Sequence, residues 1–416
     1  MTAVGTDVQW LQCVRCDEQL AIGAHVFGCP RCFQEGRQGP LDFRVNVAGG
    51  IPANFQAAWD AGPQHNIWRY GDMLPVAEHP LSLDEGGTPL THLAELSDEL
   101  GLNVYVKNET MNPTWSFKDR HAAVNISMAR QLGYSKVVAS STGNAGQAVA
   151  AYAALAGLRA LIIGYPTSSE LLRRVMQIHG ASVVTMPKPE IGTMMRQLVE
   201  DHGWLPVGSS DPNPLASPYG VTGYKTIGYE VASALGAAPD AILVPTGGGD
   251  SLYGIWRGLI DLHAMGLIAR LPRIVGCQTE ATHPLLHALT HNRTEVEVQP
   301  EPDSLATSII EGRCGMHALG ALRASGGTAT AVSEDELRLA IRRMASRGYF
   351  FESASLATIA SLVRLHGEGY FKAGETVVCV ITGSGVKWPD VINQLVPAVP
   401  HLEQPSISAL ADVMEL

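Results

Sequence analysis

The sequence predicts an α/β protein with two parallel-sheet domains and a small cysteine-rich segment at its amino terminus. From residue 104 onward, short apolar runs typical of strands alternate with longer helical patterns across short connections. This β-α-β order places parallel strands in a sheet that helices cover on both faces. The composition agrees, because 46% hydrophobic residues, 17% charged residues and 43 glycines suit a large apolar core with many tight turns.

The amino-terminal segment holds four of the seven cysteines, in two C-x-x-C pairs separated by twelve residues. Cys13 and Cys16 form the first pair, and Cys29 and Cys32 form the second. Four thiolates at this spacing can bind one zinc ion tetrahedrally, which a reducing compartment favours over two disulfides. We therefore predict a zinc-ribbon-like segment over residues 1–45. A ribbon that has lost its metal, or four ordinary thiols, is the alternative.

The remaining elements follow in chain order after aromatic and proline-rich loops that we expect over residues 41–100. A first series predicts strands over 104–107, 136–139, 161–164 and 182–185. The helices between these strands are expected over 117–132, 145–156 and around 171–179. A second series predicts a helix over 252–264 and strands over 241–244, 273–277 and 376–381. Two series indicate two α/β domains with a cleft between them.

Charge and apolar patterning limit the partners of the 416-residue chain. Its formal net charge of −11 repels the phosphate backbone of nucleic acids, while a local positive pocket for an anionic small molecule remains compatible with it. The first residues lack the basic start and apolar run of a signal peptide, and no run of about 18 apolar residues predicts a membrane helix. We expect a cytoplasmic protein that binds a small molecule, with no nucleic-acid or membrane partner.

A candidate nucleophile lies in residues 112–120, which read Asn-Pro-Thr-Trp-Ser-Phe-Lys-Asp-Arg. Of the seven lysines in the chain, Lys118 has the polar neighbours with which a protein can hold an aldehyde cofactor as an imine. The alternative needs no cofactor: Ser116 caps a helix, and a solvated Lys-Asp-Arg turn follows.

A glycine-rich turn over residues 245–251 joins a predicted strand to a predicted helix. Its glycines allow backbone N–H groups to converge on an anion, and the positive end of the helix favours a phosphate group. The spacing matches neither a Walker loop nor the dinucleotide fingerprint, so a plain loop is the alternative.

Further polar turns lie at strand ends or helix starts. Residues 140–146, Ser-Ser-Thr-Gly-Asn-Ala-Gly, suit a carboxylate at a helix start, or else Thr142 and Asn144 only cap that helix. Thr382 opens the turn that follows the last predicted strand. Glu352 lies before Ser-Ala-Ser, either near a substrate or only as a helix N-terminal carboxylate.

In this order, the motifs resemble those of the fold-type II pyridoxal-phosphate (PLP) enzymes, and among them the threonine synthases. The resemblance covers about residues 86–390 and also includes segments 86–90 and 223–226. It implies PLP as the cofactor, a large PLP-binding domain over 46–138 and 226–416, and a small mobile domain over 139–225. Some relatives of this type carry an amino-terminal ribbon, and we expect a homodimer.

The resemblance also implies roles for individual residues. Lys118 bonds to the cofactor and then acts as general base, Asn144 contacts the phenolic oxygen, and Thr382 faces the pyridine nitrogen. The cofactor phosphate is assigned to Gly247, Gly248, Gly249, Asp250 and Ser251. The implied substrate contacts are Lys107, Ser116, Ser141, Thr142 and Gly143.

The chain departs from the threonine-synthase pattern near the expected substrate. Trp115 and His121 stand where glycine is common, Ser384 replaces a histidine, Ile310 replaces an arginine, and Glu311 adds negative charge. These changes predict a substrate that is bulkier or less anionic than phosphohomoserine.

The expected activity is elimination or replacement at the β or γ carbon of an amino acid, converting phosphohomoserine to threonine or acting on a diverged analogue. One alternative is a cysteate-synthase-like or threonine-dehydratase-like enzyme that performs β-replacement or dehydration on serine, phosphoserine or threonine. The other is a binding module without turnover, which the presence of Lys118 argues against.

Overall fold

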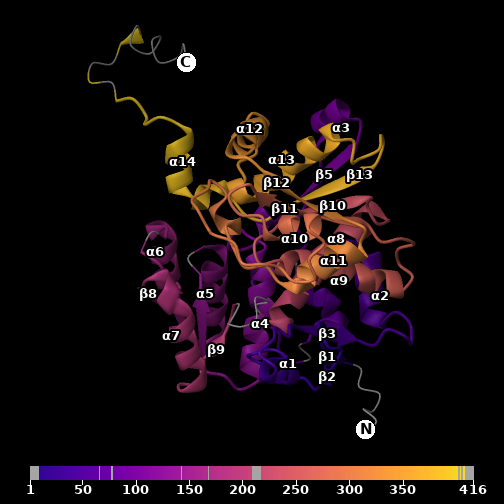
Figure 1. Ribbon diagram of the computed structural model, residues 1–416, viewed down its shortest axis with the longest axis vertical. Helices are drawn as coiled ribbons and strands as arrows, with labels where there is room; N and C mark the ends of the chain where they lie inside the picture. The colour runs from indigo at the N-terminus through magenta and orange to yellow at the C-terminus, as the bar shows by residue number, and fades with distance from the viewer. Residues whose placement is uncertain are drawn as a thin grey trace.

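Three β-sheets organise the chain in the computed structural model, which describes residues 9–64, 66–75, 78–141, 143–166, 168–208, 217–401, 403 and 406–407. Figure 1 shows the sheets and the helices that cover them. The amino-terminal sheet has the order β2-β1-β3 and is antiparallel, with β1 at Gln9–Cys13, β2 at Gln19–Leu20 and β3 at Leu41–Val45.

The largest sheet has six strands in the order β12-β11-β10-β13-β5-β4, and all neighbours are parallel except β4 and β5. Its strands are β4 (Leu90–His92), β5 (Asn103–Asn108), β10 (Ala241–Pro245), β11 (Arg273–Thr279), β12 (Thr328–Val332) and β13 (Thr376–Ile381). Both inner strands β10 and β13 are almost wholly apolar and buried, as expected for parallel strands with helices on both faces.

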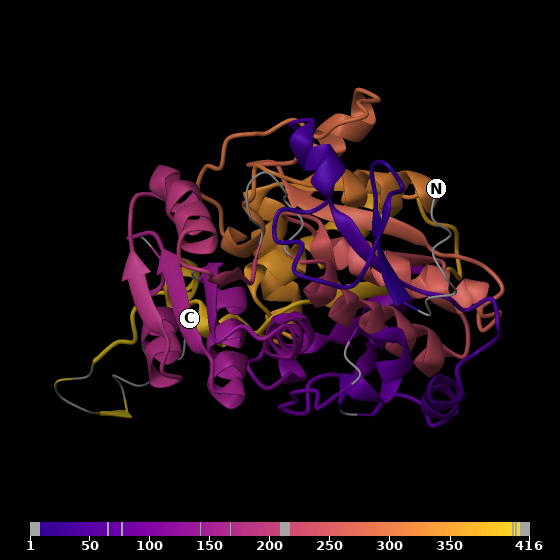
Figure 2. The ribbon, with the colours of Figure 1, turned by 90° about the horizontal axis from the view of Figure 1, so that it is seen from below.

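The third sheet is parallel, has the order β8-β7-β6-β9, and lies to one side of the molecule in Figures 1 and 2. It consists of β6 (Lys136–Ser140), β7 (Arg159–Gly164), β8 (Ser182–Thr185) and β9 (Leu205–Pro206). Its helices are α5 (Asn144–Ala156), α6 (Glu170–Ile178) and α7 (Lys188–Glu200).

The other helices are α1 (Pro30–Gln34), α2 (Ala53–Asp60), α3 (Ala94–Leu100), α4 (Lys118–Gln131), α8 (Pro218–Leu235), α9 (Asp250–Ala264), α10 (Pro284–Thr290), α11 (Met316–Ala324), α12 (Glu334–Ala345), α13 (Ser353–Gly367) and α14 (Pro389–Leu395). Short 3-10 helices occupy η1 (Ile67–Met73), η2 (Glu109–Met111), η3 (Thr307–Ile309) and η4 (Gly385–Lys387).

Helices α4, α8 and α9 pack closely, since α8 contacts both of the others. Glycines make this approach feasible: a Cβ atom at Gly223 would lie 2.1 Å from the carbonyl oxygen of Arg120, and one at Gly258 would lie 2.4 Å from that of Lys225. Because α4 begins at Lys118 and α9 begins at Asp250, this packing positions two of the predicted site motifs on adjoining helices.

The amino-terminal sheet docks on α8 and α9, and Figure 2 shows it lying across the larger part of the molecule. Asp42 on β3 forms an ion pair of 2.9 Å with Arg257 on α9. The hydroxyl group of Tyr219 on α8 donates a hydrogen bond of 2.6 Å to the carbonyl oxygen of Gly23. The ribbon therefore braces the helices that support the candidate site.

The predicted fold class, two parallel-sheet domains with a zinc-ribbon-like segment, is confirmed, with local corrections. The expected domain boundaries at 138/139 and 225/226 stay predictions, and these positions fall within β6 and α8. The expected loops over 41–100 contain β3, α2, η1, β4 and α3. Among the described residues, no helix is both long enough and apolar enough to cross a membrane.

Candidate active site

Lys118 is the first residue of α4, and its side chain is partly buried against aromatic rings. Its Nζ atom lies 4.7 Å from the ring centroid of Phe117 and 5.7 Å from that of Tyr224. Burial lowers the pKa of the Lys118 amine, although the nearby carboxylates of Asp250, Glu352 and Glu311 oppose that shift. A lowered pKa increases the fraction of free amine, which is the form that attacks a carbonyl group.

The segment before Lys118 is held by the end of β13. The backbone N–H of Phe117 donates to the carbonyl oxygen of Thr382 at 2.9 Å, and the N–H of Ser384 donates to that of Trp115 at 3.1 Å. Trp115 has a φ of 60°, a left-handed conformation that suits glycine better than a bulky side chain. The structure therefore brings the lysine motif and the Thr382 turn together.

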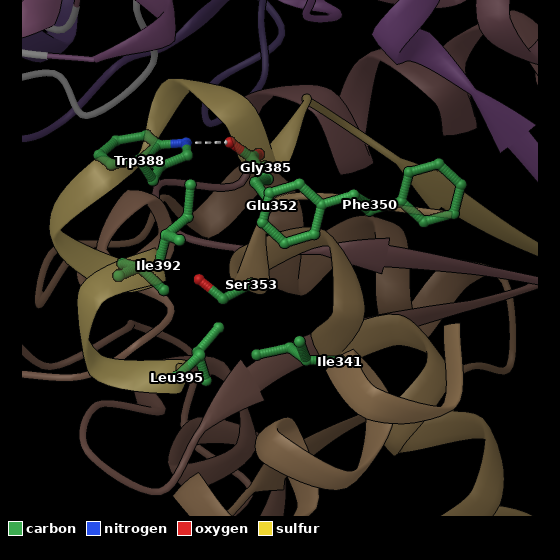
Figure 3. A pocket seen from close by; sticks show the side chains of 10 residues that line it. Ile341, Phe350, Glu352, Ser353, Gly385, Trp388, Ile392 and Leu395 are labelled. Carbon is green, nitrogen blue, oxygen red and sulfur yellow. Dashed lines mark hydrogen bonds between the residues drawn. The ribbon is translucent and has the colours of Figure 1, made fainter. Parts of the chain in front are cut away.

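Glu352 connects three groups from different segments. Its carboxylate accepts hydrogen bonds from Nδ2 of Asn144 at 2.8 Å, from Oγ1 of Thr382 at 2.8 Å and from Nε1 of Trp388 at 2.9 Å. Figure 3 shows the bond from Trp388. The carboxylate is buried and is the acceptor shared by these groups, while the hydroxyl of Thr382 also bonds to Oγ of Ser355 at 2.9 Å. Of the two interpretations of Glu352, the structure favours a residue of the site over a simple helix terminus.

Several buried polar atoms around Lys118 have no hydrogen-bond partner among the described residues. They are Oγ of Ser116, Nε2 of His121, Oδ1 of Asn144 and the hydroxyl group of Tyr224. Unpaired buried polar groups are costly, so such a group of atoms indicates a place where a polar ligand binds. PLP, with its ring substituents, fits this requirement.

The glycine-rich turn precedes α9 as predicted. Gly249 has a φ of 98°, and a Cβ atom there would lie 2.5 Å from Cβ of Ala318, so only glycine suits the position. Ser251, in the first turn of α9, is buried. The amino end of this helix can therefore hold a phosphate group with backbone N–H donors.

Asp250, the first residue of α9, faces His317 on α11, with 3.5 Å between Oδ1 and Nε2. Burial raises the pKa of Asp250, but His317 and Lys118 favour its charged form and lower the pKa overall. His317 was not predicted, because no sequence motif connects α11 with the glycine-rich turn.

The turn after β6 lies on the other side of the site. Oγ of Ser141 accepts a hydrogen bond from the N–H of Gly146 at 3.0 Å, and Gly143 immediately precedes α5. A Cβ atom at Gly143 would lie 3.1 Å from the ring of Trp388, so this turn lies against the residue that also contacts Glu352. Thr142 lies outside the described residues.

Lys107 requires a correction. Its ammonium group is buried, pairs with Glu230 at 2.6 Å and donates to the carbonyl oxygen of Thr88 at 2.5 Å. Arg120 completes this network, with ion pairs of 2.7 Å to Glu109 and 2.6 Å to Glu230. Lys107 is thus neutralised inside the protein, and the expectation that it contacts a substrate phosphate is wrong.

A small pocket lies behind Glu352 and is shown in Figure 3. Apolar side chains of α12 and α14, including Ile341, Ile392 and Leu395, form part of its wall. This lining does not suit the charged groups of an amino acid. The pocket therefore belongs to the packing of α14 against the site.

The four amino-terminal cysteines converge as predicted. Their sulfur atoms all lie within 4.8 Å of one another, with 3.8 Å from Cys13 to Cys32 and 3.7 Å from Cys16 to Cys29. A zinc–sulfur distance of about 2.3 Å in a tetrahedron gives sulfur–sulfur edges of about 3.8 Å. The cysteines are free, because a disulfide requires about 2.05 Å.

Comparison with known proteins decides the family. A family model described as pyridoxal-phosphate dependent enzyme matches residues 81–383. The chain belongs to this family. The cofactor of this family is PLP, and Lys118, the glycine-rich turn and the unpaired buried polar atoms are suited to bind it.

Curated relatives agree with the predicted resemblance to threonine synthases. The chain is 32% identical to the threonine synthase of Methanosarcina acetivorans over 391 residues, covering 92% of this chain and 93% of that protein. It is 34% identical to the threonine synthase of Methanocaldococcus jannaschii over 335 residues, covering 78% and 81%. These relatives support a PLP-dependent lyase that performs elimination, and they do not favour the dehydratase alternative.

Solved structures confirm the fold. The processed form of threonine deaminase isoform 2 from Solanum lycopersicum matches with a TM-score of 0.60 at 22% identity, over 88% of this chain and 89% of that one. An L-serine ammonia-lyase from Rhizomucor miehei matches with a TM-score of 0.63 at 20% identity, over 74% and 98%. At this identity the likeness concerns the architecture alone.

Proposed function

We propose that the chain catalyses a PLP-dependent elimination or replacement at the β or γ carbon of an amino acid, as a threonine-synthase-like enzyme. The observation that carries this proposal is the convergence of Lys118, Thr382 and Asn144, which the contacts of Phe117 and Glu352 join into one site. When bound, PLP supplies an electron sink for carbanions at the substrate.

The residues of the chain divide the remaining work. Lys118 would hold the cofactor through its amine, and the same amine can accept and return protons at the substrate carbons. The turn 247–251 holds the phosphate group at the start of α9. Thr382 and Asn144 would hold the cofactor ring, at its pyridine nitrogen and its phenolic oxygen respectively, and Ser116, Ser141 and Gly143 would bind the substrate.

The direct test is covalent labelling of the purified protein. Borohydride reduction followed by peptide mapping should place the cofactor on Lys118, and Lys118→Ala should lose both the label and the yellow colour. Lys387→Ala is a control with another buried lysine. A label on any lysine other than Lys118 contradicts the assignment.

For the substrate, we propose phosphohomoserine or a diverged analogue that is bulkier or less anionic. Lys107 and Arg120 are paired with buried carboxylates, so neither is free to bind a substrate phosphate. The carboxyl groups near Lys118, those of Asp250, Glu352 and Glu311, add negative charge that disfavours an anionic substrate. Trp115, whose side chain is half exposed in a left-handed conformation, adds bulk beside the lysine motif.

To test this proposal, the purified protein is mixed separately with phosphohomoserine, phosphoserine, serine and threonine, and the change in the absorption spectrum of the cofactor is measured for each. The double change Trp115→Gly with Ile310→Arg should raise threonine formation from phosphohomoserine. One restored charge-assisted contact is worth about 1.5 to 3 kcal/mol, or roughly ten- to a hundredfold. Efficient threonine formation by the native protein, together with loss in the double variant, contradicts the divergence.

We further propose one structural zinc ion at Cys13, Cys16, Cys29 and Cys32. Four thiolates leave no coordination position open, so this metal would stabilise the fold without taking part in catalysis. Metal analysis of protein purified without chelator should give one zinc per chain, and its absence would refute the site. The homodimer and the cytoplasmic location stay predictions. Sedimentation would test the first, and cell fractionation would test the second.

A further inference from the structure

His317 is a buried histidine directly beneath the glycine-rich turn. Its side chain is fully buried, and neither ring nitrogen has a hydrogen-bond partner among the described residues. A Cβ atom at Gly249 would lie 3.5 Å from Nε2 of His317, so this nitrogen faces the turn. If this position served packing alone, an apolar residue would suit it better than a histidine, because burying an unpaired polar group is costly.

The carboxylate of Asp250 gives this position a specific electrostatic problem. Asp250 is the first residue of α9, where the helix and the turn together attract an anion. A phosphate group that binds there carries about two negative charges at neutral pH and meets a third on Asp250. The Asp250 charge therefore opposes the binding for which the turn is otherwise built.

His317 lies where it can remove that conflict. Its Nε2 atom is 3.5 Å from Oδ1 of Asp250, and a proton on the ring would offset the carboxylate charge. We propose that His317 is a positioning residue that takes up a proton when a phosphate group occupies the turn 247–251, and so neutralises Asp250. This inference rests on the proposed function, which assigns the turn to the cofactor phosphate.

Of the other titratable groups near His317 and the turn, one carboxyl group, that of Glu311, also changes charge near neutral pH. The ring of Tyr253 on α9 lies 5.2 Å from the His317 ring, and burial raises the pKa of Tyr253. Burial, followed by the charges of Asp250 and Glu311, raises the pKa of Cys314, whose sulfur lies beside the turn. On α4, Lys118 and His121 both favour the charged form of Asp250. Burial, followed by the charge of Glu301, raises the pKa of Glu311 to about 7, so the part of the pH dependence that belongs to the pair of Asp250 and His317 is the part that His317→Gln removes.

The test measures the dissociation constant of pyridoxine 5′-phosphate between pH 6.5 and 9 by calorimetry, with the cofactor-free full chain. This compound has the phosphate group but no aldehyde, so the imine chemistry of Lys118 does not contribute. Pyridoxine without phosphate is the matched control ligand. Because binding takes up a proton, the affinity of the native protein for pyridoxine 5′-phosphate should fall as the pH rises, by up to about tenfold per pH unit over part of this range.

Three variants isolate the pair. His317→Gln should bind the phosphate ester about tenfold more weakly at pH 6.5 and lose most of the pH dependence. Asp250→Asn should bind tightly at both ends of the pH range. The double variant should recover the affinity that His317→Gln loses, because without the carboxylate no compensating proton is needed. A merely structural role of His317 would not be rescued by Asp250→Asn.

The outcomes separate the two proposals. Unchanged pH dependence in His317→Gln, or a double variant no better than that single variant, would overturn the role of His317. If His317→Gln does not fold, Asp250→Asn alone decides, since a pH dependence as steep as that of the native protein refutes the proposal. Failure of the folded protein to bind the ester, with no borohydride label on Lys118, would instead remove the proposed function and this inference with it.

Discussion

At the scale of single residues, the carboxylate of Glu352 determines how the site is held together. We predict that Glu352→Ala lowers the free energy of unfolding by about 1 to 3 kcal/mol or somewhat more, because the buried amide of Asn144 loses its acceptor. The half-buried indole of Trp388 and the hydroxyl of Thr382, which keeps its bond to Ser355, lose less. Glu352→Gln should cost less, since its amide oxygen still accepts two bonds while its NH₂ group donates to the hydroxyl of Thr382. Urea denaturation measures the difference, and equal losses in the two variants would disagree with this geometry.

His121 gives a prediction for acid conditions. Burial, followed by the nearby charge of Lys118, lowers its pKa to about 4, whereas the unfolded side chain has a pKa of about 6.5. Between these values the unfolded state binds more protons, so the contribution of His121 to stability falls as the pH decreases from about 6.5 to 4. The loss is at most about 3 kcal/mol.

His121→Gln should remove that part of the pH dependence, as measured by the free energy of unfolding at pH 7.5 and pH 5. The exposed His202 provides the control, because His202→Gln should leave the slope unchanged. A slope that is the same in His121→Gln and in the native protein would contradict the prediction.

At the scale of helices, the buried network of α4 and α8 predicts a large effect. Arg120 pairs with Glu109 and Glu230, and all three side chains are buried. Arg120→Leu should lower the free energy of unfolding by about 3 to 5 kcal/mol, because two buried carboxylates keep only Lys107 as a cation. Chemical denaturation measures this loss.

The control for Arg120 is Arg174 on α6, which pairs with Glu170 four residues earlier on the exposed surface. Arg174→Leu should change stability by less than about 0.5 kcal/mol. Comparable losses in the two variants would mean that the buried network does not stabilise the packing of α4 and α8.

In the zinc-ribbon-like segment, Gly39 packs so closely against two of the cysteines that we expect no larger residue to fit. A Cβ atom at Gly39 would lie 2.6 Å from Cβ of Cys32 and 2.8 Å from that of Cys29, so Gly39→Ala should distort the cysteine cluster. We expect this variant to retain less zinc and to unfold at a lower temperature. Gly49→Ala, at a position with open space, should match the native protein in both measurements. Equal zinc content in the two variants would contradict the prediction.

The elements also show what the sequence can predict. Strongly apolar strands such as β10 and β13 were expected within one or two residues, because burial on both faces leaves a continuous apolar run. Helices α2 and α3 were expected as loops, since each is short. The order of the motifs along the chain predicts that Lys118, Asn144 and Thr382 belong to one site. The pairing of Asp250 with His317 could not be predicted, because it depends on tertiary packing that no local sequence pattern encodes.

At the scale of the whole molecule, the order of strands in the large sheet has a consequence for synthesis. Strand β13, which is made near the end of the chain, lies between β10 and β5 and pairs with both. Strand β5 therefore leaves the ribosome about 270 residues before its partner, and such long-range contacts slow folding. During that interval, the unpaired edge of β5 is exposed to aggregation. The four-stranded sheet, whose strands lie within residues 136–206, can form earlier, so truncation before β13 should leave that sheet as the part of the nascent chain most able to fold.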